Sequence, residues 1–224
     1  TPLFHIDACQ APRFLDLNVA RLGVDLMTIN ASKLYGPRGV GALYVRRGIQ
    51  LAGQIVGGGQ ENNRRAGTEN VAGALGLARA LEICAAERQS ESRRLIKLRN
   101  QLITGLLKMP GVTLNGPAPD SATPRLPNNI NVSVAGFDGE QLVIELDARG
   151  IACSTGAACS IPERDGAYVI MALDSTGEES ARARALSAVR FTLGRDTIAS
   201  DIRYVLKSFA EILKKYVSTA KITL

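Results

Sequence analysis

Short apolar runs separated by turn residues open the chain, and they predict strands at about 3–9, 25–30 and 41–45. A turn-rich stretch, Tyr35-Gly36-Pro37-Arg38-Gly39, precedes the third strand. From residue 70 to about residue 109, helix formers carry apolar residues at spacings of three and four. This region predicts one long helix, or two helices joined by a bend.

Beyond Pro110-Gly111, the chain alternates between the two periodicities. Strands are predicted at 129–134, 151–154 and 188–193, and helices at about 139–149 and 198–216. Strands that alternate with helices are typical of an α/β or α+β protein. The long helix would then join two lobes, with a boundary near residues 88–94, so we expect one part at 1–91 and another at 92–224.

Length and composition place the chain among ordinary globular proteins of one or two domains. It has 224 residues, 46% hydrophobic and 21% charged. The sequence contains neither a membrane-spanning apolar run nor the features of a signal peptide, which favours a cytoplasmic protein. The net charge of +6 is spread along the chain and aromatic residues are scarce. This argues against nucleic-acid binding and leaves solubility or an anionic small molecule to explain the basic surplus.

The cysteines and the single histidine restrict the chemistry further. No C-x-x-C pair occurs, and His5 is the only histidine, so a structural zinc site is not expected. A Ser-His-Asp or Cys-His protease would need His5 as its base. Because His5 stands in an apolar strand, we expect it to be a packed core histidine instead.

Two charged residues at predicted strand ends suggest cofactor chemistry. Lys33 lies between an apolar strand and a rigid turn, where a lysine amine can act as a nucleophile. Asp7 ends another apolar strand, and a buried acid needs a positive partner. Pyridoxal phosphate (PLP) uses this pair, the lysine as its Schiff-base partner and the acid as the partner of the pyridinium nitrogen. Taken singly, Lys33 fits a surface lysine and Asp7 a helix cap or salt bridge.

Several motifs occur together and in order, and through them the chain resembles the NifS/IscS-type cysteine desulfurases of the class V aminotransferase family. The motifs are His5-Ile6-Asp7-Ala8-Cys9-Gln10, Ser32-Lys33-x-Tyr35-Gly36-Pro37-Arg38-Gly39, Arg65-Ala66-Gly67-Thr68-Glu69-Asn70, Pro127-Asn128-Asn129-Ile130-Asn131-Val132-Ser133, Ser154-Thr155-Gly156-Ala157-Ala158-Cys159-Ser160 and Val189-Arg190-Phe191-Thr192-Leu193-Gly194-Arg195.

The resemblance implies fold type I of PLP-dependent transferases. The first part of the chain would be the second half of the large cofactor domain, and the rest the small C-terminal α+β domain. It also implies a homodimer that converts L-cysteine to L-alanine and passes sulfur, as an enzyme persulfide, to an iron–sulfur scaffold or another acceptor protein.

The same resemblance implies roles for individual residues. Lys33 is expected to hold PLP and move the substrate α-proton, and Asp7 to pair with the ring nitrogen. Arg190 would grip the substrate carboxylate, for which a planar fork suits better than an ammonium. Cofactor contacts are further expected from Gln10 at the phenolic oxygen, from Asn30 and Ser32, and from Thr68 at the phosphate of the neighbouring subunit.

Cys159 resembles the sulfur-accepting nucleophile, and it stands among small residues that suit a mobile loop. It would also be the one candidate for a transient iron–sulfur ligand. The interval from 161 to 167 fits the long-loop group of the family. Cys9, Cys84 and Cys153 are expected to be core thiols.

The sequence departs from the family pattern in two respects. Ser32 and Asn30 stand where the family commonly has histidine and serine, and the glycine-threonine phosphate loop of the first half is not found. Because the sequence also begins with Thr1 instead of Met, we expect a piece of a longer protein. Two other interpretations stay open: a non-catalytic dimerisation or scaffold-binding module, and a related lyase or aminotransferase.

Overall fold

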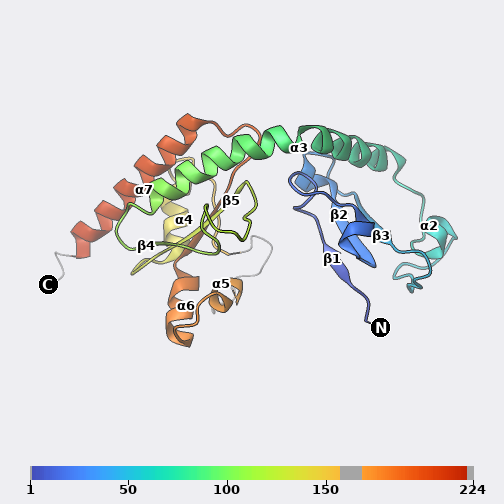
Figure 1. The fold of residues 1–224 in the computed structure, drawn as a ribbon, viewed down its shortest axis with the longest axis horizontal. Coiled ribbons are helices and arrows are strands. Elements are labelled where there is room, and N and C mark those ends of the chain that lie inside the picture. The colour runs from blue at the N-terminus through green and yellow to red at the C-terminus, as the bar shows by residue number, and fades with distance from the viewer. Residues whose placement is uncertain (1, 157–167, 221–224) are drawn as a thin grey trace. The chain divides into compact units, whose positions relative to one another are not determined.

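The computed structural model of the chain describes residues 2–156 and 168–220, and no helix within them is long and apolar enough to cross a membrane. It divides into two compact units, unit 1 (Thr1–Ser90) and unit 2 (Glu91–Leu224), and helix α3 belongs partly to each. The elements follow in this order (Figure 1): β1 His5–Asp7, α1 Val19–Leu22, β2 Leu26–Asn30, the 3-10 helix η1 Ala31–Leu34, β3 Gly41–Val45, the short α2 Gln60–Asn63, α3 Val71–Leu106, β4 Val112–Leu114, β5 Asn129–Val134, α4 Gly139–Asp147, α5 Tyr168–Ala172, α6 Glu178–Leu186, β6 Ala188–Thr192 and α7 Ala199–Ala220.

Unit 1 is built on a three-stranded sheet in the order β1-β2-β3. β1 runs parallel to β2 with Asp7 opposite Thr28, and β3 runs antiparallel to β2 with Gly41 opposite Asn30. The first half of α3 packs beside this sheet through small and medium-sized side chains. These buried residues are Leu77, Ala80 and Cys84 of α3, which meet Ala31 and Leu34 of η1.

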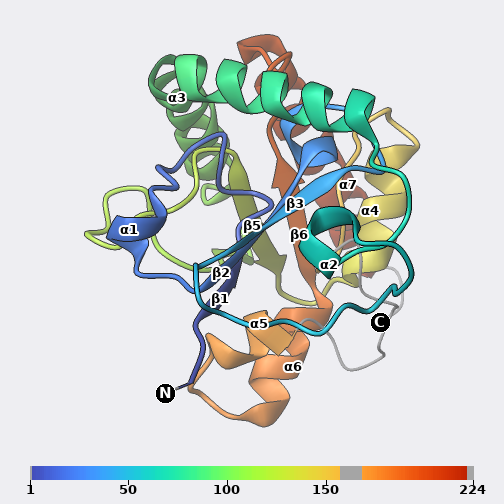
Figure 2. The same ribbon diagram turned by 90° about the vertical axis from the view of Figure 1, so that its right-hand side faces the viewer.

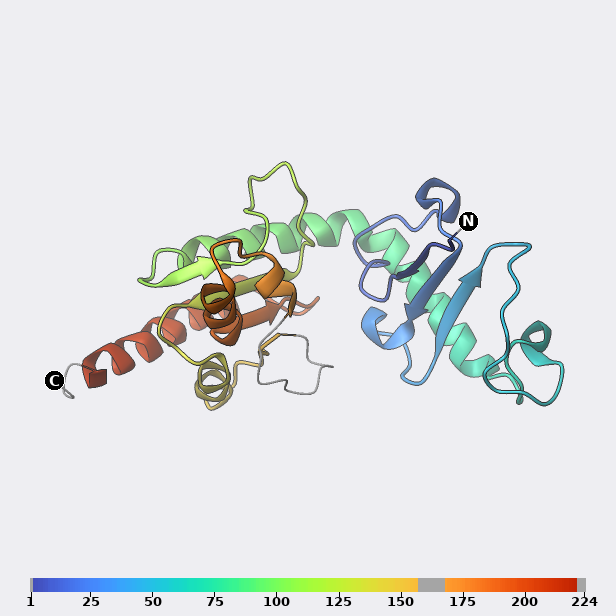
Figure 3. The ribbon, with the colours of Figure 1, turned by 90° about the horizontal axis from the view of Figure 1, so that it is seen from below.

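Unit 2 holds a second three-stranded sheet, antiparallel throughout, in the order β4-β5-β6. Along β5, Ile130, Val132 and Val134 alternate with polar residues, so that one face of the strand is apolar. The second half of α3 and helix α7 lie together on one side of this sheet (Figure 3), and they approach closely where Gly105 meets Leu206. On the other side α5 packs against α6 (Figure 2).

Most of the predicted elements are present, with changed lengths. The long helix is one continuous element of 36 residues. The strand predicted at 3–9 shortens to three residues, and the region 151–154 contributes only a bridge from Ser154 to Arg190. The predicted elements do not include β4, the 3-10 helix η1 or the helices α1, α2, α5 and α6. The separate roles expected for residues 1–91 and 92–224 stay predictions.

The prediction that His5 is a core histidine is wrong. Its side chain is exposed, and its ring Nε2 lies 2.9 Å from the hydroxyl of Thr28. The reason is the alternation along β1, where Ile6 turns toward the interior and its two neighbours turn outward. Of the three cysteines expected in the core, Cys84 is buried, whereas Cys9 and Cys153 are half-buried.

Candidate functional site

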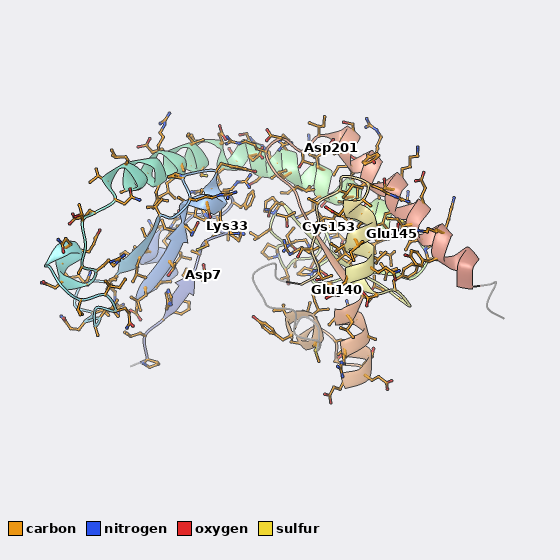
Figure 4. The ribbon with its side chains drawn as sticks, turned by 180° about the vertical axis from the view of Figure 1, so that it is seen from behind. Asp7, Lys33, Glu140, Glu145, Cys153 and Asp201 are labelled. Atoms are coloured by element: carbon orange, nitrogen blue, oxygen red, sulfur yellow. The ribbon has the colours of Figure 1, made fainter. Side chains whose placement is uncertain are left out.

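The predicted cofactor residues of unit 1 gather at one edge of its sheet. Asp7 is the last residue of β1, and Lys33 stands in η1, which follows β2 directly. Because β1 and β2 are parallel, their carboxyl ends meet at the same edge, where ligands commonly bind in α/β sheets. Figure 4 labels both side chains in unit 1. The Lys33 charge also acts on the thiol of Cys9, two residues after Asp7.

Asp7 is held by its neighbour Cys9. The backbone N–H of Cys9 donates to Oδ1 of Asp7 at 2.9 Å, and the Cys9 thiol bonds to the same carboxylate. These two hydrogen bonds lower the pKa of Asp7, so this exposed acid stays ionised at neutral pH. Burial and the Asp7 carboxylate raise the pKa of the Cys9 thiol to about 11, and the Lys33 charge opposes this rise. Cys9 is therefore a thiol, not a thiolate, at neutral pH.

The turn that carries Lys33 is tied at both ends. At its start, the side chain of Asn30 accepts hydrogen bonds from the N–H and the hydroxyl of Ser32, at 2.8 and 2.5 Å. At its end, Tyr35 takes a left-handed backbone conformation with φ 61°, which is uncommon outside glycine. The guanidinium of Arg13 lies over the Tyr35 ring, 4.5 Å from its centroid. These contacts hold the turn while the Lys33 side chain remains exposed.

Gln10 and Thr68, the other predicted cofactor contacts of unit 1, have exposed side chains. Gln10 follows Cys9 in the turn after β1, and Thr68 follows Gly67, whose φ of 102° favours glycine. Neither side chain forms a hydrogen bond with another described residue. Gln10 thus lies near Asp7 in the chain, whereas among the described residues no hydrogen bond joins Thr68 to Asp7 or Lys33.

Arg190, the predicted substrate-binding residue, lies on β6 of unit 2. Its Nε donates to the carbonyl of Gly156 at 3.0 Å, and its Nη1 donates to the hydroxyl of Thr192 at 2.7 Å. Its backbone is fixed as well, because its N–H and carbonyl both bond to Ser154. Thr192 is not among the site residues expected from the sequence, although period-two alternation places residues 190 and 192 on one face of a strand.

Cys159, the predicted nucleophile, lies outside the described residues, as does the interval 161–167. Cys153 belongs to the described residues, and its pKa is raised to about 11, chiefly by burial and also by the charge of Asp147. The positive charge of Arg190 acts in the opposite direction. Within residues 2–156 and 168–220, no group of three or more histidine, cysteine or acidic side chains is arranged to hold a metal ion.

Comparison with protein families decides the relationship of the chain. The family model described as aminotransferase class-V matches residues 2–205. The chain belongs to the class V aminotransferase family.

Curated relatives extend this family assignment. A protein named cysteine desulfurase IscS from Dictyoglomus turgidum is 44% identical over 213 residues, which cover 95% of this chain and 52% of the relative. Another protein of that name, from Methanosarcina thermophila, is 39% identical over 98% of this chain and 52% of the relative. The chain thus spans about half the length of the curated relatives it matches.

Solved structures support the fold. A structure titled NifS-like protein superposes with a TM-score of 0.78 at 32% identity, covering 95% of this chain and 52% of that one. The NifS-like protein from Rickettsia africae gives a TM-score of 0.81 at 27% identity, with 95% and 54% covered. The mixed α/β architecture is therefore that of NifS-like proteins, as expected for part of fold type I.

Proposed function

We propose that this chain is part of a PLP-dependent cysteine desulfurase. It would supply the lysine that binds PLP, the acid that pairs with the ring nitrogen of PLP, and the cysteine that accepts sulfur. The observation that carries the proposal is the cluster of Asp7, Cys9 and Lys33 at the carboxyl ends of two parallel strands. The names of the matching relatives support the same activity. L-Cysteine would be the substrate and L-alanine the product.

The chemistry of the unit 1 cluster fits PLP. When bound, PLP supplies an aldehyde that combines with amines and a ring that withdraws electrons. The Asp7 carboxylate stays ionised and so suits a protonated ring nitrogen. No carboxylate among the described residues forms an ion pair with Lys33, which leaves its amine available. Gln10, Asn30 and Ser32 would add polar contacts, and Thr68 one to the other subunit of a homodimer.

The remaining chemistry would come from Arg190 of unit 2 and from Cys159, which lies outside the described residues. Arg190 would hold the substrate carboxylate through the N–H groups that Gly156 and Thr192 do not use. Lys33, once its Nζ has lost a proton, would accept the proton from the substrate α-carbon. The Cys159 thiolate would attack the substrate sulfur, and the carbon–sulfur bond of the substrate would break with its electron pair left on the carbon fragment, which is protonated on the way to L-alanine. Cys159 would then carry the sulfur as a persulfide, whose outer sulfur passes to an iron–sulfur scaffold or another acceptor protein.

Peptide mapping after reaction with PLP tests the cofactor site. The whole chain is incubated with limiting PLP and reduced with borohydride, and the labelled lysines are identified by mass spectrometry. We expect Lys33 to be labelled first, ahead of exposed lysines such as Lys97 and Lys207. Asp7→Ala should weaken this preference, and Asp16→Ala, which removes an acid of unit 1 that pairs with Arg21, should not. If all exposed lysines were labelled to the same extent, the proposed cofactor site would be contradicted.

A second experiment tests sulfur transfer. The PLP-loaded chain is given L-cysteine, and persulfide is sought on each cysteine-containing peptide. We expect persulfide on Cys159, its absence in Cys159→Ser, and retained Lys33 labelling in that variant. Labelling of Lys33 without any persulfide would favour a non-catalytic module. Persulfide that persists in Cys159→Ser would show that another cysteine is the acceptor.

A further inference from the structure

The side chain of Arg190 is fixed from two directions. Its Nε donates to the Gly156 carbonyl at 3.0 Å, and its Nη1 donates to the Thr192 hydroxyl at 2.7 Å. Both distances are those of well-formed hydrogen bonds. The backbone of Arg190 also bonds to Ser154 in both directions, at 2.7 and 3.2 Å. The base and the tip of this side chain are therefore both constrained.

Several donors of the Arg190 guanidinium remain unused. A guanidinium carries five N–H groups, of which Gly156 takes the one on Nε and Thr192 takes one of the two on Nη1. Both N–H groups of Nη2 and the second one of Nη1 form no hydrogen bond with another described residue. No ion pair joins Arg190 to an acid within residues 2–156 and 168–220. The free N–H groups on the two terminal nitrogens can together form a fork for one carboxylate.

We propose that Thr192 is a positioning residue that orients the Arg190 guanidinium for carboxylate binding. This inference rests on the substrate role proposed for Arg190. A single bond at Nε fixes one donor direction and lets the guanidinium plane turn about it, whereas a second bond at Nη1 fixes the plane. Thr192 therefore prepares the fork before the ligand arrives, and preorganisation of this kind strengthens binding.

The hydroxyl, and not the bulk of Thr192, is the important feature. Arginine has only donors, so the Thr192 oxygen acts as the acceptor in this bond. Valine has nearly the same shape without an acceptor, whereas serine keeps the acceptor and loses the methyl group. Thr192 is exposed on β6, so these changes leave the core of unit 2 intact. Rescue by serine separates orientation of Arg190 from simple packing.

Protection from chemical modification provides the test. The whole chain and its Thr192→Val, Thr192→Ala and Thr192→Ser variants are treated with 4-hydroxyphenylglyoxal, and modification of Arg190 is followed by peptide mass spectrometry. Sodium propionate serves as a carboxylate without amine or thiol, and sodium chloride at equal ionic strength serves as its control. Arg203 on α7, which is exposed, provides the internal reference.

We expect propionate to protect Arg190 in the unmodified chain. About five-fold more propionate should be needed in Thr192→Val and Thr192→Ala, which is the effect of losing one ordinary hydrogen bond, while Thr192→Ser stays close to the original. Equal protection curves for Thr192→Val and the unmodified chain would overturn the positioning role and leave the role of Arg190 standing. Failure of propionate to protect Arg190 in any version would overturn its carboxylate-binding role itself.

Discussion

The two units differ in the size of their apolar cores. Val24 is the one unit 1 residue among the twelve largest side chains that are fully buried in the described part of the chain; the others belong to unit 2. Unit 1 buries mainly alanines and medium-sized side chains, and its buried Asp25 pairs with Arg46. The candidate cofactor residues thus belong to the unit with the smaller apolar core, and all of them except the half-buried Asn30 are exposed.

Truncation of Phe209 is the strongest way to test the apolar core of unit 2. Phe209 is fully buried in α7, and its ring packs edge-to-face on Phe191 of β6 at 6.2 Å between centroids. Phe209→Ala should lower the free energy of unfolding by about 3–5 kcal/mol, because a large cavity is left. Urea unfolding followed by far-ultraviolet circular dichroism measures this.

The matched control for Phe209 is Ile144→Ala on α4. Ile144 is 68% exposed, so its truncation should change the free energy of unfolding by less than about 0.5 kcal/mol. A loss of less than about 1 kcal/mol in Phe209→Ala would show that unit 2 does not depend on this core. The contrast between the two units would then be wrong.

The ion pair between Asp25 and Arg46, the polar tie of unit 1, should have the next largest effect on the free energy of unfolding. The Asp25 carboxylate, 7% exposed, lies 2.5 Å from Nη2 of Arg46 and accepts a hydrogen bond from the N–H of Phe4 at 2.7 Å. Asp25→Ala should cost about 2 kcal/mol, since the Phe4 N–H loses its acceptor while the half-exposed Arg46 is rehydrated. Faster hydrogen exchange of the β1 and β2 amides would report this loss.

Asp16→Ala is the control for that polar tie. Asp16 also pairs with an arginine, Arg21, but the side chains are 50% and 70% exposed. Its removal should therefore cost less than about 1 kcal/mol. If Asp16→Ala destabilises unit 1 as much as Asp25→Ala, burial of the Asp25 carboxylate is not what makes the tie effective.

Sequence patterns predicted the strands and helices better than they predicted the surroundings of single side chains. The strands at 25–30, 41–45, 129–134 and 188–193 and the long helix follow from periodicity, which depends only on local spacing. The outward direction of His5 and the half-burial of Cys9 depend on which face of β1 is covered, and a three-residue strand carries too little alternation to show it. Strand alternation places Arg190 and Thr192 on one face, so their hydrogen bond could be foreseen. The hydrogen bond between Arg190 and Gly156 joins residues 34 positions apart, which local spacing does not predict.

Cys9 and Cys153 offer a comparison of the candidate sites themselves. The pKa of each thiol is raised to about 11, but the Asp7 hydrogen bond contributes only at Cys9. Asp7→Asn removes the negative charge that disfavours the thiolate, so the pKa of Cys9 should fall. Each unit of decrease raises the thiolate fraction at pH 8 about ten-fold.

Alkylation rates at pH 8 measure that change in the thiolate fraction. Iodoacetamide should modify Cys9 about ten-fold faster in Asp7→Asn, for a fall of one pKa unit, and the rate at Cys153 in unit 2 should not change. Cys153 therefore serves as the control within the same molecule. An unchanged rate at Cys9 would mean that the Asp7 carboxylate does not raise the pKa of the Cys9 thiol. Faster alkylation at both cysteines would instead indicate that the variant is less stably folded.

The smallest effect is expected from a partly exposed polar cluster of unit 2, in which the side chain of Lys215 is 59% exposed and that of Glu145 is 20% exposed. Glu145 of α4 (Figure 4) accepts hydrogen bonds from Lys215 at 2.7 Å and from the Tyr216 hydroxyl at 3.0 Å, and these lower the pKa of Glu145 below its usual 4.5. The stability that these two hydrogen bonds give the folded state is fully present above pH 4.5, and it is lost as the pH falls through the lowered pKa of Glu145. Glu145→Gln should therefore leave the urea midpoint at pH 7 nearly unchanged and flatten its decline in acid.

Lys215→Met tests whether the Glu145 effect arises from this one pair. Because Lys215 is the first cause of the lowered pKa, its removal should flatten the acid decline much as Glu145→Gln does. The double variant should add little to either single change, since both remove one shared interaction. Additive effects would mean that the two charges act through separate partners. A large shift at pH 7 would show that the Glu145–Lys215 pair stabilises unit 2 about as strongly as Asp25–Arg46 stabilises unit 1, against the expected order of effects.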